Sequence, residues 1–344
     1  MKKLTCGILI LTLCLACAWA LAEDGSSLAA IDGGEDAVLT LEPGEKADGG
    51  AEAGVPSQAP QEPDGGIGGD EEGPRWTYAV SLRALHSPYL LLVNADNLLE
   101  EDYAPDPLIK MSMVKRATSA TLYMEQTAAE ALETMFDAAR EVTEYAYVAQ
   151  NSKGAEVEKV AEFSDGMKLF LKSAYRSYGT QKTTYANYLA RNNNVDDGYV
   201  AKPGASEHQS GLCADILNED YAGRDRMTQD FKWTPEAQWM KENCAEFGFI
   251  LRFPEDKENE TGIKFEPWHF RYVGREAAGY IMSKGISLEE FCDEWQFELA
   301  QFIGRGGDVD AQIAYEESRL NAPPESFVLN EYGEDGDAEV SLVF

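Results

Sequence analysis

The sequence predicts an α+β protein whose folded part spans about residues 76–305 of the 344-residue chain. Two patterns predict this class: apolar residues at three- and four-residue steps, which are typical of amphipathic helices, and short apolar or alternating runs, which are typical of strands. A third observation sets the limits, because residues 23–75 hold few aromatic or branched apolar side chains and residues 306–344 are acidic. A sizeable core can form only between these two segments.

Helices are predicted by periodicity and by their end signals. Residues 126–142 carry apolar side chains on one face, which indicates a helix that packs on a sheet, and residues 180–192 form a second candidate. Thr234 followed by Pro235 is a typical helix start, and that helix should run to about Phe247. Ser287 and Glu290 have the spacing of a capping box and predict a further helix.

Strands are predicted where short apolar or alternating runs lie between turn residues. We expect a strand or an extended arm at residues 89–93. Further strands are expected at 167–174, 212–216, 248–251 and 268–272. Residues 151–154, in a stretch otherwise hard to assign, indicate a turn.

The formal charge of −32 excludes binding to nucleic acid or to an anionic membrane through a basic face. Lys2 and Lys3 precede an apolar run that ends in a small-x-small cleavage site at residues 20–22. We therefore expect residues 1–22 to be an export signal, with a retained membrane anchor or a lipid-modified Cys17 as alternatives. Each of these three possibilities places the protein outside the cytoplasm, in the extracellular space or the cell envelope.

Residues 23–75 are rich in Gly, Ala, Pro, Asp and Glu and predict a disordered acidic spacer. It would hold the folded part away from the membrane, or it is simply a tolerated tail. Residues 306–344 are expected to form an acidic C-terminal tail.

Of six cysteines, three belong to the N-terminal segment, which leaves Cys213, Cys244 and Cys292. An odd number cannot pair completely, and these three show no CxxC spacing. We expect buried free thiols rather than a disulfide framework.

The chain has only three histidines, and two of them lie near a carboxylate. His208 precedes Asp215 by seven positions, and His269 follows Glu266 by three. Two imidazoles and a carboxylate suit a zinc ion that keeps one coordination position open. Taken alone, a histidine and an aspartate seven residues apart often occur by chance, so the spacing supports a metal site only weakly. His86, the third histidine, has no such partner and is interpreted as structural or exposed.

Glu266 and His269 would point to opposite faces of a regular strand. Pro267 interrupts regular pairing, so a bulge or a turn could bring both side chains to one site. Glu266 is then a candidate general base, or else a surface glutamate before an aromatic cluster.

Four segments, in this order, resemble those of a known family: residues 173–181, 206–215, 247–254 and 266–274. Together they are similar to the zinc D-alanyl-D-alanine carboxypeptidases of the VanY type, within the D,D-peptidase/hedgehog-like metallopeptidases. The resemblance covers about residues 85–285. It implies the fold of that group, a small antiparallel sheet flanked by helices.

The resemblance also implies roles for individual residues, which extend the weak spacing argument. Zinc would be held by His208, Asp215 and His269, with Glu266 as the catalytic base. Arg176 would contact the substrate, and Gln181 and Ser206 would line its pocket.

The implied reaction removes the C-terminal D-alanine from peptidoglycan stem peptides, and we expect the protein to act as a monomer. L,D-carboxypeptidase action on tetrapeptide stems, and a wall-binding module of this fold that lacks catalysis, remain open. Two features depart from the family: Cys213 replaces a small or apolar residue, and residues 141–172 are unfamiliar. The second departure could change substrate preference without changing the metal site.

Overall fold

The computed structural model describes residues 73–224 and 226–320. The expected export signal or anchor at residues 1–22, nearly all of the spacer at 23–75 and residues 321–344 of the tail lie outside the described residues. Within the described part, no helix is both long and apolar enough to cross a membrane.

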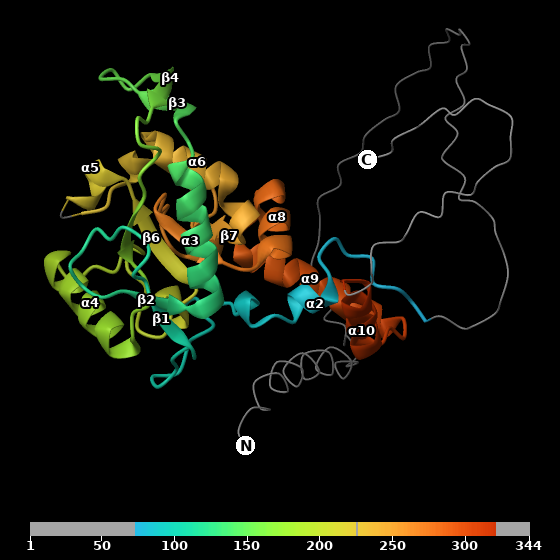
Figure 1. The fold of residues 1–344 in the computed structure, drawn as a ribbon. Coiled ribbons are helices and arrows are strands. Elements are labelled where there is room, and N and C mark those ends of the chain that lie inside the picture. The colour runs from blue at the N-terminus through green and yellow to red at the C-terminus, as the bar shows by residue number, and fades with distance from the viewer. Residues whose placement is uncertain (1–72, 225, 321–344) are drawn as a thin grey trace, which may run out of the picture. The chain divides into compact units, whose positions relative to one another are not determined.

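A four-stranded antiparallel sheet forms the centre of the fold, with the strand order β5-β6-β8-β7. The strands are β5 (Phe170–Ser173), β6 (Cys213–Leu217), β8 (His269–Tyr272) and β7 (Phe249–Leu251). Two hairpin-like pairs lie beside it, β1 (Leu108–Lys110) with β2 (Tyr123–Glu125) and β3 (Glu144–Gln150) with β4 (Glu156–Glu162). The small antiparallel sheet expected from the sequence is therefore present, and so are the flanking helices (Figure 1).

The described helices range from single turns to four or more turns. The α-helices are α2 (Leu82–Leu85), α3 (Gln126–Arg140), α4 (Tyr178–Arg191), α5 (Glu219–Ala222), α6 (Pro235–Asn243), α7 (Glu258–Thr261), α8 (Arg275–Lys284), α9 (Leu288–Gly304) and α10 (Val309–Leu320). The 3-10 helices are η1 (Pro88–Leu90), η2 (Glu207–Ser210), η3 (Gln229–Trp233) and η4 (Cys244–Phe247).

One face of the central sheet is apolar and packs on α3 and α6. Alternate residues of the strands, such as Ile216, Phe249, Leu251 and Phe270, point to this face and are buried. Helix α3 contributes its whole apolar stripe to the same cluster, and Figure 1 shows the helix lying across the sheet. We call this set of residues the sheet cluster.

A second apolar cluster joins residues 76–92, which we call the N-terminal arm, to the helices α8 and α9. Its buried members are Val80, Leu82, Leu85, Leu90, Ile250, Val273, Ala277, Ala278, Ile281, Leu288, Phe291, Cys292, Trp295, Leu299 and Phe302. Only Ile250 comes from the central sheet, and Val273 follows directly after β8. We call this the helical cluster.

Most predicted elements occur within a few residues of their expected bounds, but three features differ. Of the strand or extended arm expected at residues 89–93, the strand is absent: residues 88–90 form a 3-10 turn, because Pro88 starts the turn and Leu90 packs into the helical cluster. Leu91 then adopts an extended conformation, and residues 91–93 belong to no helix or strand. The unassigned stretch after α3 forms the β3–β4 hairpin around the predicted turn, although apolar and polar residues do not alternate strictly in either strand. Helix α10 lies beyond residue 305, where we expected the folded part to end; its Glu316 accepts hydrogen bonds from the backbone N–H groups of Leu82 and Arg83.

Candidate active site

His208 is presented by a short 3-10 helix that ends at a glycine. Gly211 has φ of +72°, and a Cβ there would lie 2.8 Å from Cγ of Pro105 and 3.1 Å from the backbone nitrogen of Glu125. The tight approach therefore requires glycine at this position. The His208 side chain is buried, and its Nδ1 lies 2.6 Å from the carbonyl oxygen of Ala174. This contact makes Nδ1 the N–H donor and leaves the lone pair on Nε2 available.

Asp215 and His269 are directly paired across β6 and β8, so their side chains share one face of the sheet. Asp215 Oδ1 lies 3.0 Å from Nδ1 of His269, and its Oδ2 lies 3.4 Å from Nε2 of His208. The two imidazole rings stand nearly perpendicular, with their centroids 5.1 Å apart. The three side chains therefore converge from two strands and one turn.

Glu266 joins this group through a turn, as the sequence suggested. The backbone N–H of His269 donates to the carbonyl of Glu266 at 3.1 Å, and Pro267 lies inside that turn. Because the chain turns here instead of continuing as a strand, Glu266 Oε2 comes within 3.7 Å of Nδ1 of His269.

Asp215 and Glu266 differ in the direction in which their surroundings shift the pKa. Burial alone would raise the pKa of Asp215, but the imidazoles of His208 and His269 outweigh burial and hold that pKa well below its usual range. Burial raises the pKa of Glu266 to about 7; His269 partly opposes this rise, and Asp215 adds to it. One carboxylate is thus fixed as an anion, and the other is poised to exchange a proton near neutral pH.

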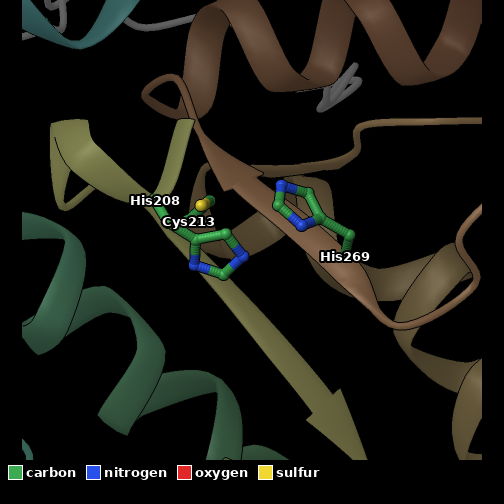
Figure 2. Close-up of side chains that lie close together, drawn as sticks. All are labelled: His208, Cys213 and His269. Atoms are coloured by element: carbon green, nitrogen blue, oxygen red, sulfur yellow. The ribbon is translucent and has the colours of Figure 1, made fainter. Parts of the chain in front are cut away.

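Cys213 shares the sheet face of Asp215, two residues away on β6. One ring nitrogen of His208, one of His269 and the Cys213 sulfur lie within 4.8 Å of one another, and Figure 2 shows this thiol beside the two imidazoles. All three cysteines in the described part of the chain are free and buried, as expected.

The donor atoms fit a catalytic zinc ion. Nε2 of His208, a carboxylate oxygen of Asp215 and Nδ1 of His269 form the set of two nitrogens and one oxygen that zinc prefers in open sites. His208 already has the partner on its other nitrogen that zinc-binding histidines require. Asp215, Glu266 and His269 form one candidate metal group, which overlaps with the group that contains Cys213. We favour His208, Asp215 and His269 as the ligands, because Glu266 then lies next to them and is free to act as a base.

The remaining predicted site residues lie in distinct settings. Arg176 donates its backbone N–H to the carbonyl of His208, and its charge acts on both His208 and Glu266. Its Nε is buried and has no hydrogen-bond partner among the described residues.

Gln181 is 1% exposed and donates from Nε2 to the carbonyl of Ala201, which ties α4 to the segment before η2. Ser206 is also buried and precedes η2. Substrate contacts by Gln181 and Ser206 stay predictions.

Three charged residues beside His269 had no role in our interpretation of the sequence: Glu207, Arg252 and Arg271. All three are buried, and both guanidinium groups contact the same oxygen of Glu207. A detectable signal existed, because charged residues at positions 252 and 271 interrupt otherwise apolar strand segments.

The sequence profile of one family, described as VanY D-alanyl-D-alanine carboxypeptidase, matches residues 156–275. The putative carboxypeptidase YodJ of Bacillus subtilis is 32% identical over 210 residues, which is 60% of this chain and 67% of the relative. A D-alanyl-D-alanine carboxypeptidase of Enterococcus faecium is 37% identical over 138 residues, 40% of this chain and 41% of the relative. The solved structure of the LD-carboxypeptidase LdcB is 32% identical, with a TM-score of 0.48, and the match covers 59% of this chain and 84% of that one.

The match to the family profile coincides with much of the site described above. It begins in β4, contains Arg176, His208, Asp215, Glu266 and His269, and ends at the first residue of α8. The identity to the Bacillus relative extends over most of that protein's length. The chain therefore belongs to the VanY family of D-alanyl-D-alanine carboxypeptidases.

Proposed function

We propose that this chain is an exported zinc carboxypeptidase that removes the C-terminal D-alanine from peptidoglycan stem peptides. One observation carries the proposal: three buried donor atoms of His208, Asp215 and His269 converge beside the carboxylate of Glu266. Family membership supports the reaction type, and the E. faecium relative carries the name of this activity. The apolar run at residues 4–21, with two lysines before it, supports export.

His208, Asp215 and His269 would hold the metal in this mechanism. Zinc bound there would supply Lewis acidity, which polarises a carbonyl and makes water a better nucleophile. Asp215 would remain an anion, because its pKa lies well below the usual range.

Glu266 would move the protons. Its carboxylate would accept a proton from the attacking water and then deliver it to the nitrogen of the departing D-alanine. A pKa of about 7 suits both steps, since the group can accept and release a proton near neutral pH.

Arg176 would bind the substrate. Its Nε is buried and has no hydrogen-bond partner within residues 73–224 and 226–320, and a guanidinium can form paired hydrogen bonds with a carboxylate. It would therefore orient the terminal carboxylate or the carbonyl of the cleaved bond.

Products from synthetic stem peptides test the assignment directly. We expect zinc-loaded protein to release one D-alanine from a pentapeptide stem that ends in D-Ala-D-Ala, as measured by mass spectrometry. Release of D-alanine from a tetrapeptide stem alone would overturn the D,D assignment in favour of L,D-carboxypeptidase action. Release from neither stem would favour a wall-binding module without catalysis.

Glu266→Gln tests the proton transfer. The variant should bind zinc but lose about 10²–10⁴-fold in kcat, because an amide cannot accept the proton. Glu255→Gln is a matched control, since Glu255 is an exposed partner of Lys232 and should leave kcat unchanged. Parent-like hydrolysis by Glu266→Gln would show that the proposed base is wrong.

A further inference from the structure

We propose that Glu207 is a positioning residue that fixes the orientation and tautomer of His269. The inference rests on the proposed function, in that it assumes zinc binding by Nδ1 of His269. It goes further by assigning a task to a buried carboxylate that takes no part in the proton transfers.

The two side chains face each other in a fully buried setting. Glu207 is 3% exposed and His269 is 3% exposed. Oε2 of Glu207 lies 3.6 Å from Nε2 of His269, on the side of the ring away from Asp215. Neither of these two atoms has a hydrogen-bond partner among the described residues. These two atoms, a ring nitrogen that can donate and a carboxylate oxygen that can only accept, therefore lie a few tenths of an ångström beyond hydrogen-bond distance.

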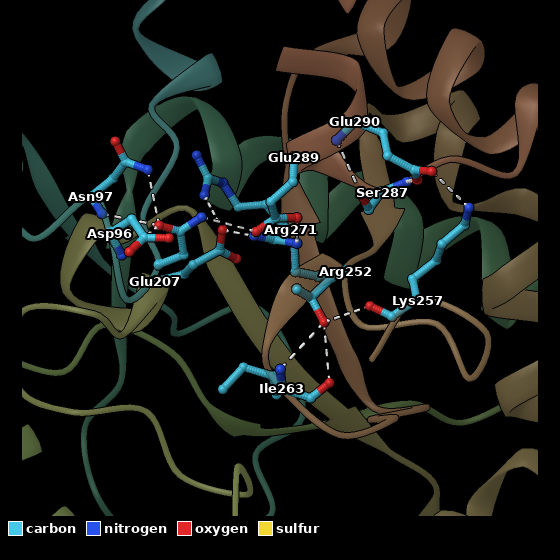
Figure 3. Close-up of polar contacts among 12 residues, drawn as sticks. Asp96, Asn97, Glu207, Arg252, Lys257, Ile263, Arg271, Ser287, Glu289 and Glu290 are labelled. Atoms are coloured by element: carbon cyan, nitrogen blue, oxygen red, sulfur yellow. Dashed lines mark hydrogen bonds and ion pairs between the residues drawn. The ribbon is translucent and has the colours of Figure 1, made fainter. Parts of the chain in front are cut away.

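Two arginines hold Glu207 in this position. Its other oxygen, Oε1, accepts from Nε of Arg252 at 2.8 Å and from Nη1 of Arg271 at 2.6 Å (Figure 3). Both guanidinium groups are fully buried. Because both arginines bind Oε1, Oε2 is left for His269.

The arginines are themselves fixed from outside the site. Arg271 donates from Nη2 to the carbonyl groups of Tyr89 and Leu91 in the N-terminal arm. Arg252 binds both carboxylate oxygens of Glu289 in α9, at 2.8 and 2.5 Å. The network whose inner end is the Glu207 carboxylate is thus anchored by residues next to the helical cluster, which contains the neighbouring Leu90 and Leu288.

The consequence for His269 follows from the chemistry of imidazole. A neutral ring carries one N–H, and a carboxylate facing Nε2 places that hydrogen there. Nδ1 lies at hydrogen-bond distance from Oδ1 of Asp215, 3.0 Å, so a proton between these two atoms would have to leave when zinc binds. With the N–H of the ring kept at Nε2 by Glu207, the lone pair of Nδ1 is then available to zinc. Carboxylates in this role orient metal-binding histidines, and their loss weakens metal affinity about 10–100-fold.

Cys213 is the rival acceptor for the same N–H. Its sulfur lies within 4.8 Å of a ring nitrogen of His269, so the thiol could take the place that we assign to Glu207. The test therefore has to separate the two groups.

Zinc affinity, measured by competition with a chromophoric chelator, separates the possibilities. We expect Glu207→Gln to bind zinc about 10–100-fold more weakly than the parent. Glu289→Gln removes a charge from the same network without touching His269, and its affinity should stay within about threefold of the parent. A Glu207→Gln affinity within threefold of the parent, or an equal loss in Glu289→Gln, would overturn the proposal. Failure of the parent itself to bind zinc would instead overturn the proposed function.

Two further measurements keep the test decisive if Glu207→Gln does not fold. Glu207→Asp keeps the charge between the arginines but withdraws the carboxylate by one methylene, so the same direction of loss is expected. In zinc-loaded parent protein, the Nε2–H of His269 should give a slowly exchanging resonance in ¹⁵N–¹H spectra. This resonance should persist in Cys213→Ala; its loss there would assign the acceptor to the thiol and refute the role of Glu207.

Discussion

The sheet cluster and the helical cluster bury their polar groups in different ways. Beside the sheet cluster lies a face that carries buried ionisable side chains: His208, Asp215, His269, Glu207, Arg252 and Arg271. The helical cluster is apolar, and the buried Ser287, which directly precedes its member Leu288, caps a helix end. Charged groups that are removed from water need charged or hydrogen-bonding partners. The charged face therefore consists of paired side chains that can take part in chemistry, whereas the helical cluster contributes mainly to stability.

The register of the central sheet explains how the two regions meet. Asp215 pairs with His269, Cys213 pairs with Arg271, and Ile250 also pairs with Arg271. Directly paired residues lie on the same face, so one face runs from the metal ligands through the arginines to the helical cluster. The opposite face is apolar throughout and belongs to the sheet cluster.

Matched truncations give the largest expected effects and test whether the regions are separable. Phe270→Ala in β8 and Phe291→Ala in α9 each remove a fully buried ring and should cost about 3–5 kcal/mol of unfolding free energy. Urea unfolding in the presence of a chelator measures this loss of unfolding free energy without a contribution from bound zinc. Only Phe270→Ala should also weaken zinc binding, because Phe270 follows His269 directly in the strand. An equal loss of zinc affinity in Phe291→Ala would contradict the comparison.

Removing the cation that connects the two regions should cost less. Arg252→Met leaves Glu289 without this partner and Glu207 with Arg271 alone, so we expect a loss of about 3 kcal/mol, at the low end for broken buried pairs. Lys232→Met breaks a more exposed pair with Glu255 and should cost less than about 1 kcal/mol. If Arg252→Met were as stable as the parent in urea unfolding, the network would not tie the regions together.

The smallest expected change in unfolding free energy comes from removing one helix cap in each region. Ser287 caps α9 in a capping box with Glu290, which also contacts Lys257 (Figure 3), and Thr234 caps α6. Ser287→Ala and Thr234→Ala should each lower the unfolding free energy by about 1 kcal/mol. Zinc affinity should be unchanged in both, since neither cap touches the metal ligands. A loss confined to one variant would show that the two regions do not contribute equally to global unfolding.

Local signals were sufficient for most elements. The apolar stripe of α3 and the capping box of α9 were readable because each arises within one or two helical turns. The hairpin of β3 and β4 could not be predicted from the sequence, because apolar and polar residues do not alternate strictly in either strand. The two strands are stabilised by pairing with each other and by Gln238, which bonds to both the N–H and the carbonyl of Val148. Cross-strand partners are not encoded in the local pattern.

Residue identities and short spacings were enough to predict which residue types form the candidate site. With only three histidines, the chain offers few combinations for a nitrogen and carboxylate metal site, and the motif around His208 and His269 selects one of them. The turn at Pro267 could also be anticipated, because proline interrupts a strand. These signals are residue types and short-range conformational constraints, and both can be recognised in the sequence without knowledge of the fold.

The orientation of these groups depends on contacts between segments that lie far apart in the sequence. The carbonyl that fixes His208 comes from Ala174, and the arginines that fix Glu207 come from positions 252 and 271. The anchor of Arg252, Glu289, lies in a helix beyond the region matched by the family profile. Such partners are tens of residues apart in sequence and meet only when strands pair and helices pack, so no local pattern could reveal them.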